Sequence, residues 1–199
     1  MYRQRAEERM RQLRGLNQKQ EIARRICLAV DEAYEIAKND IRTDILLIHR
    51  MEQIKLPVRM VTDEEFAQAR TQIETPSTDP SNRRKMVWHK DVIARHQRQK
   101  TNPYFDAELH VIRLGDVAIC TNPFELFTDF GIRIKARSKA LQTFIIQLTG
   151  SGGYVPTEKA VRAGGYSAVV ESNVVGHEGG QVIVDKTVEY INSLWTESP

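Results

Sequence analysis

The pattern of apolar and polar positions along this 199-residue chain predicts an alternation of helices and strands. Apolar residues recur at about 3.6-residue spacing over residues 18–39, which predicts an amphipathic helix. The next apolar runs, DILLIH and IKLPVRMV, are β-like, so we expect two strands near 42–50 and 53–61. Pro57 places the second strand at a sheet edge or a bulge, because proline cannot donate to a ladder.

The segment that follows carries a signal for the start of a helix. Thr62 and Glu65 have the spacing of a capping box and predict a helix over residues 63–74. The sequence TPSTDPSN (75–82) then predicts a loop, and a strongly basic helix is expected from Arg83 to Lys100.

The second half of the chain alternates between the two periodicities. The expected elements are a hairpin with strands at 107–112 and 117–120, a helix over 124–139, a strand over 143–148, a glycine-rich loop at 150–153, a short helix near Thr157, and a helix over 179–195. This order predicts an α/β fold, with a mixed β-sheet, packing helices, a long N-terminal helix and a C-terminal helix.

Composition fits one globular domain. The hydrophobic fraction is 41% and the charged fraction 28%. We expect a basic extension over residues 1–17, disordered or helical, and a single α/β domain over 18–199. No apolar run approaches the roughly 20 residues of a membrane span, so we expect a soluble protein. The charged N-terminus is not a signal peptide, which implies the cytoplasm if Met1 is the natural start.

Positive charge is concentrated near the N-terminus. Residues 1–25 hold eight Lys or Arg against three Glu. A nucleic-acid site is not favoured, because Glu7 and Glu8 interrupt the basic run and Tyr2 is its only aromatic residue. A solvated helix face is the expectation, with a basic helix that docks a partner as the alternative.

Cysteines and histidines offer little chemistry on their own. Cys27 and Cys120 lie in apolar stretches, so we expect buried free thiols. His89 and His96 share a helix face about 10 Å apart, which is too far for a helical zinc pair. We expect structural roles for the remaining histidines. His49 and His110 lie at predicted strands and should pack against their neighbours, and His177 lies in the loop that starts the last helix.

Known catalytic motifs are missing, and one carboxylate stands out. The chain has no GxSxG elbow and no phosphate-binding glycine motif around GSGG (150–153). Glu125 follows a predicted buried strand in the segment CTNPFELF. It either completes the electrostatics of a helix N-terminus or serves as a metal ligand or base at a strand end.

From about residue 108 onward the sequence resembles the neutral/alkaline ceramidase family, in the later half of the catalytic domain. The stretches that carry the resemblance, in order, are VIRLGDVAICTNPFELF, TDFGIRIKARS, TFIIQLTG, GGYVPTEKAVRAGGY and SNVVGHEGGQVIVDKTVEYINSL. The resemblance implies a zinc-dependent amide hydrolase that acts on a lipid-like amide, with zinc bound in a full-length parent. It further implies that this chain is only the C-terminal part of that domain.

The resemblance also assigns residues. Family members hold zinc with two histidines from the earlier half, a glutamate and a tyrosine. Glu125 matches the glutamate of a Pro-Gly-Glu-type segment, in which Phe124 replaces the glycine. The family's tyrosine position falls within residues 150–152, and Tyr154 matches a later tyrosine. We therefore expect Glu125 as a metal ligand and Tyr154, Gly152 and Gly153 as substrate-binding residues.

Three functions follow as alternatives. The first is a ceramidase-like hydrolase domain that is catalytically incomplete by itself, since one matched ligand does not make a zinc site. The second is a non-catalytic offshoot of the family, and the third an interaction module. If an earlier half normally covers the sheet, an apolar face or an unpaired edge should be exposed, which favours a homo-oligomer.

Overall fold

The computed structural model describes residues 2–75 and 82–196, so most of the expected loop at 75–82 lies outside the described residues. The chain separates into two compact units, Met1–Ile45 and Leu46–Pro199. The boundary between them lies well after residue 17. No helix in the described part of the chain is long and apolar enough to cross a membrane.

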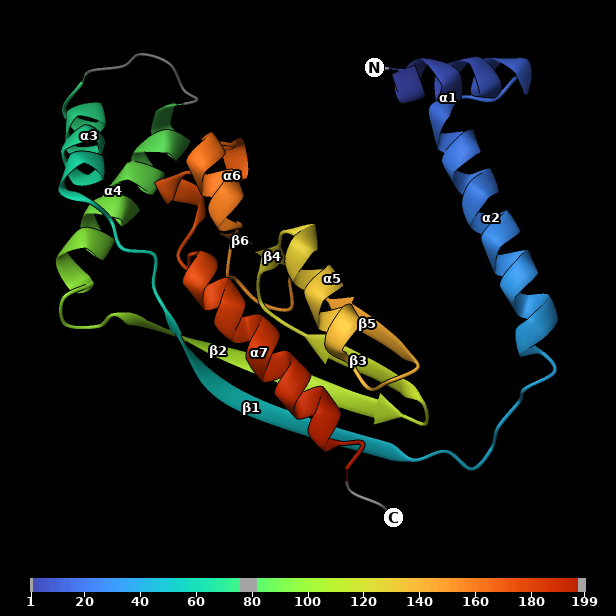
Figure 1. Cartoon of the computed structure of the whole chain (residues 1–199). Helices are drawn as coiled ribbons and strands as arrows, with labels where there is room; N and C mark the ends of the chain where they lie inside the picture. The colour runs from blue at the N-terminus through green and yellow to red at the C-terminus, as the bar shows by residue number, and fades with distance from the viewer. Residues whose placement is uncertain (1, 76–81, 197–199) are drawn as a thin grey trace. The chain divides into compact units, whose positions relative to one another are not determined.

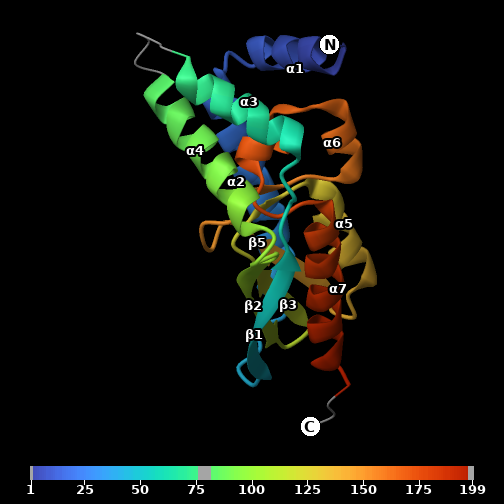
Figure 2. The ribbon, with the colours of Figure 1, turned by 90° about the vertical axis from the view of Figure 1, so that its left-hand side faces the viewer.

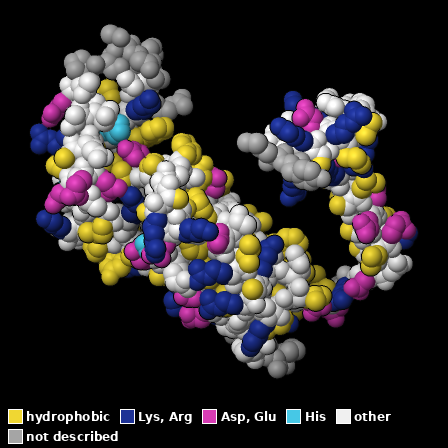
Figure 3. All heavy atoms as spheres, turned by 45° about the horizontal axis from the view of Figure 1, so that its top comes forward, with side chains coloured by type: hydrophobic (Ala, Val, Ile, Leu, Met, Phe, Trp, Pro, Cys, Tyr) yellow, Lys and Arg dark blue, Asp and Glu magenta, His cyan; other side chains and the backbone are white. Residues whose placement is uncertain are grey.

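The first unit consists of two helices, α1 (Tyr2–Leu13) and α2 (Gln18–Ala37) (Figure 1). Asn17 caps α2 in a capping box with Gln20, a feature that the hydrophobic pattern did not indicate. The apolar side chains of α2 are exposed, and Figure 3 shows hydrophobic surface on this unit.

A four-stranded mixed sheet is the frame of the second unit. Its strands are β1 (Leu47–Pro57), β2 (Tyr104–Leu114), β3 (Val117–Thr121) and β5 (Gln142–Ile146), in the order β1-β2-β3-β5. The β1–β2 and β2–β3 pairs are antiparallel, and β3–β5 is parallel. The prediction of an α/β fold with a mixed sheet is confirmed.

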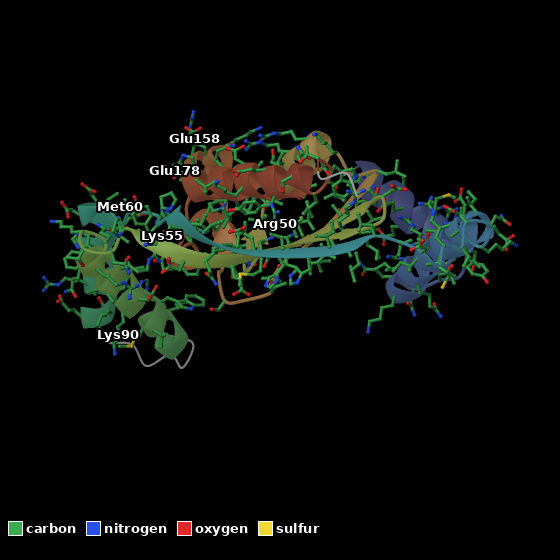
Figure 4. All side chains as sticks on the ribbon, turned by 90° about the horizontal axis from the view of Figure 1, so that it is seen from below. Arg50, Lys55, Met60, Lys90, Glu158 and Glu178 are labelled. Carbon is green, nitrogen blue, oxygen red and sulfur yellow. The ribbon has the colours of Figure 1, made fainter. Side chains whose placement is uncertain are left out.

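Helices α5 (Thr128–Arg137) and α7 (His177–Ser193) pack on one face of this sheet (Figures 1 and 2). Figure 4 shows Arg50 reaching from β1 towards α7, where it donates a hydrogen bond of 2.8 Å to Ser193 Oγ. The core lies between these layers and is built on inward-facing strand residues such as Leu56, Leu109 and Cys120.

Two further helices, α3 (Asp63–Glu74) and α4 (Asn82–Arg98), lie side by side beyond the end of β1 (Figures 1 and 2). The predicted Thr62–Glu65 capping box is present at the start of α3. The remaining elements are short: β4 (Glu125–Leu126), β6 (Tyr154–Val155), α6 (Glu158–Ala163) and the 3₁₀ turns Tyr166–Ala168 and Val170–Ser172.

Two predicted element boundaries are wrong. The expected strands at 42–50 and 53–61 form one strand, because β1 pairs with β2 without interruption from Leu47 to Pro57. The expected helix at 124–139 begins only at Thr128, because the preceding residues form β4 instead. Glu125 N–H and Phe127 N–H donate to Gly153 O and Val155 O, which removes them from a helical turn.

Two smaller corrections concern Cys27 and α7. Both cysteines are free, and Cys120 is buried as expected, but Cys27 is exposed on α2. Its apolar neighbours in the sequence lie on a helix that buries little of its surface in this unit. The last helix begins at His177, two residues earlier than predicted.

Candidate functional site

The carboxylate singled out by the sequence lies in a small parallel pair of strands. In the β4–β6 pair, Glu125 is the register partner of Tyr154. The pairing is fixed by backbone hydrogen bonds, among them Glu125 N–H to Gly153 O at 2.9 Å. Both side chains are half-buried. The structure therefore brings together two residues that the sequence had assigned to different roles.

The side chains of Glu125 and Tyr154 interact electrostatically. The pKa of Tyr154 is raised, first by the negative charge of Glu125, then by partial burial and by the hydrogen bond to the same carboxylate. At neutral pH the site thus pairs a protonated phenol with Glu125. Tyr166, which the sequence did not single out, stands edge-on to Tyr154 with ring centroids 6.3 Å apart.

The two predicted glycines shape the backbone behind this pair. Gly153 has a positive φ of 68° and bridges to Asn173. Gly152 is buried against the ring of Phe124, where a Cβ would come within 2.2 Å of Cδ1. Their geometry indicates a role in positioning Tyr154. A direct contact of either glycine with a substrate stays a prediction.

The buried side chain of Asn173 anchors the segment that carries Tyr154. Asn173 is fully buried, and its Nδ2 donates to Tyr154 O at 3.2 Å and to Ser167 O at 2.7 Å. It thereby fixes the strand that carries Tyr154 and the turn that carries Tyr166. No sequence signal marked Asn173, because its importance depends on segments that meet only in the folded chain.

A second polar group lies on the outer face of the sheet. His49 Nε2 and His110 Nδ1 are 2.8 Å apart, with the two rings stacked, and His110 Nε2 lies 2.6 Å from Glu108 Oε1. His110 and Glu108 of this group line a hollow of about 910 Å³, including space open to solvent, which Gly150 and Ser151 also line. Glu125 and Tyr154 do not line it.

Each of the other histidines lies near one carboxylate. His96 contacts Asp63 at 2.9 Å, and His89 Nδ1 lies 3.5 Å from Glu171. His177 occupies the first turn of α7, 3.3 Å from Glu178. Across residues 2–75 and 82–196, no group of three or more His, Cys, Asp or Glu side chains is placed to hold a metal ion.

Comparison with known proteins gives structural neighbours only. No protein-family model matches the chain, and neither does any curated protein sequence. A neutral ceramidase from Pseudomonas aeruginosa is similar at a TM-score of 0.47 and 16% identity, covering 81% of this chain and 30% of that one. A ceramidase complexed with C2 is similar at a TM-score of 0.47 and 12% identity, covering 85% of this chain and 33% of that one. The chain spans about a third of the length of each.

Proposed function

We propose that this chain is the later part of a ceramidase-like, metal-dependent amide hydrolase domain, and that it contributes Glu125 and Tyr154 to a site completed by residues outside these 199. The single observation that carries the proposal is the direct pairing of these two side chains across β4 and β6. The sequence resemblance supplies the class of reaction.

The described residues do not fit a complete zinc site. Carboxylate oxygen is an accepted zinc ligand, but a catalytic zinc takes three protein ligands and a structural zinc four. Glu125 and Tyr154 give two oxygen donors, and no larger group of metal-binding side chains occurs among the residues described. The missing donors would come from the earlier half of the domain or from another chain. By itself, this chain is not expected to hydrolyse an N-acyl amide.

A zinc titration of the purified chain tests the proposal without relying on activity. A cation beside Glu125 offsets the negative charge that raises the pKa of Tyr154, so zinc should lower that pKa. The measurement is the pH titration of tyrosinate absorbance with and without zinc, and subtraction of the Tyr154→Phe trace isolates this residue. Glu125→Gln should lower the pKa of Tyr154 without zinc and abolish the response to zinc.

Tyr166→Phe is the matched control, because it keeps the ring contact with Tyr154 and removes a neighbouring phenol. It should retain the response to zinc. The proposal fails if Glu125→Gln leaves the pKa of Tyr154 unchanged without zinc, or if Glu125→Gln responds to zinc as the wild-type chain does. The chain would then be a non-catalytic relative that keeps the fold.

A further inference from the structure

The long helix of the first unit, α2, exposes a regular line of apolar side chains. They recur at steps of 4, 3, 4 and 3 residues and belong to Ile22, Ile26, Ala29, Ala33 and Ile36. All five are exposed. A repeat of seven residues over two turns places its members in one seam along a helix, which is the pattern of helices that pair with other helices.

The contacts that join α1 to α2 leave this seam uncovered. Arg14, which follows α1, lies 3.2 Å from Glu21, and Glu7 lies 3.8 Å from Arg25. Glu21 and Arg25 lie beside the seam on the polar side of α2. Ile26, in the same turn of helix as Arg25, is 59% exposed. The seam is therefore open to another helix.

The seam is complementary to itself when two copies of α2 run antiparallel. If Ile26 lies opposite Ala29 of the second copy, Ile22 lies opposite Ala33 of the second copy. Each large side chain then faces a small one, and the two-fold symmetry repeats both contacts. Parallel pairing would set every residue against its own copy, so that isoleucine faces isoleucine and alanine faces alanine.

The charges beside the seam favour the same direction. Arg25 and Glu32 are seven residues apart and flank the seam on one side, so antiparallel pairing places Arg25 near Glu32 of the second copy. Arg25 Nε donates to Glu21 at 2.9 Å, and its side chain is still 49% exposed. Glu32 is exposed and has no hydrogen bond or ion pair with any residue that the structure describes. Parallel pairing would place these two charges against Val30 and Ala37.

We propose that α2 binds a second copy of this chain as an antiparallel helix pair. Ile26 packs on Ala29 of the second copy, and Arg25 pairs with Glu32 of the second copy. Burial of the apolar seam stabilises the dimer, and the two charge pairs select the antiparallel direction. The surface belongs to the first unit and includes neither Glu125 nor Tyr154, so it does not depend on the proposed hydrolase function.

Sedimentation velocity of the whole chain over a concentration series tests the seam. The wild-type chain should dimerise, and Ile26→Lys should raise the dimer Kd by roughly a hundredfold or more, because the symmetric pair loses two buried side chains. Leu28→Lys is the matched control. Leu28 is 53% exposed, close to Ile26, but lies on the opposite side of α2. It should dimerise as the wild type does. Association through the sheet would contribute equally to both variants, so a difference between them reports on the seam.

Charge reversal tests the direction of the pair. Glu32→Arg replaces both attractive pairs by two arginines facing each other and should raise the dimer Kd by roughly tenfold. Asp31→Arg makes the same change of charge on the outer side of the helix and should leave the Kd close to that of the wild type. A monomeric wild-type chain, or equal dimer Kd values within either matched pair of variants, would overturn the proposal.

Discussion

Glu125 and Tyr154 meet because two short segments pair in parallel, twenty-nine positions apart along the chain. Glu125 is marked in its own stretch of sequence by its place after a buried strand, but nothing there links it to Tyr154. Their pairing places a phenol against a carboxylate, which raises the pKa of the phenol. The chemistry of the site is therefore a property of the pair, and each residue supplies only half of it.

Phe124 and Gly152 form a second pair of residues that depend on each other. Phe124 is completely buried. Its ring occupies the space that a Cβ on residue 152 would need. The large side chain at 124 thus depends on the absence of one at 152.

Gly152→Ala should destabilise the second unit by about 1–3 kcal/mol, because the added methyl group overlaps the buried Phe124 ring. The measurement is the free energy of unfolding from denaturant titration. Gly165→Ala is the control, since a Cβ there meets no atom within 4 Å. Equal stability of the two variants would contradict this close packing.

At the scale of elements, capping and ion pairs define the helices of the first unit more than burial does. Glu21 in α2 accepts hydrogen bonds from Arg24 and Arg25 at 2.9 Å and from Arg14, which follows α1, at 3.2 Å. It is the most buried residue of α2, at 5% exposure. This carboxylate therefore ties the end of α1 to the start of α2.

The same ties lower the pKa of Glu21 from 4.5 to about 2, chiefly through the hydrogen bonds from Arg24 and Arg25. A lowered pKa in the folded state stabilises the fold above the unfolded pKa and loses that effect as the pH falls towards the folded one. The α1–α2 unit should therefore lose stability between about pH 4.5 and pH 2. Backbone amide chemical shifts of residues 18–37 report this change.

Glu21→Gln should make the first unit less stable at neutral pH and flatten its dependence on pH in that interval. Glu8→Gln, which removes an exposed charge on α1, should leave the dependence intact. A titration curve that is the same in all three proteins would show that the Glu21 cluster does not hold the helices together.

At the scale of the whole second unit, the sheet is covered by helices α5 and α7 on one face (Figure 4). The outer face carries exposed apolar residues, among them Met51 (47%), Phe144 (47%) and Ile146 (45%). Strands β1 and β5 form the two edges of the four-stranded sheet. Apolar faces and open edges of this kind favour association.

We expect a second copy of the chain to associate through this outer face as the concentration rises. Ile146→Lys should shift the equilibrium towards the monomer, because it places a charge in the apolar surface. Sedimentation velocity over a concentration series measures the shift. Ile132→Lys, an equal change on the helical layer, is the control and should have a smaller effect. A wild-type chain that stays monomeric throughout would refute the expectation.

The sequence by itself determined the order and type of most elements. Periodicity of 3.6 or 2 residues is a local property, and so are the Thr62–Glu65 capping box and the hairpin at Gly115, which the structure confirms. The mixed sheet followed from the order of these elements. Glu125 could be named as a candidate because it directly follows a buried strand.

Only the tertiary structure decided which residues meet. The continuity of β1 depends on its eleven-residue pairing with β2, and the late start of α5 depends on hydrogen bonds to Gly153 and Val155. Arg59, Arg95 and Arg98 line one small pocket, although Arg59 lies far before the other two in the sequence. Register and long-range packing arise from contacts between distant segments, and no local pattern encodes them.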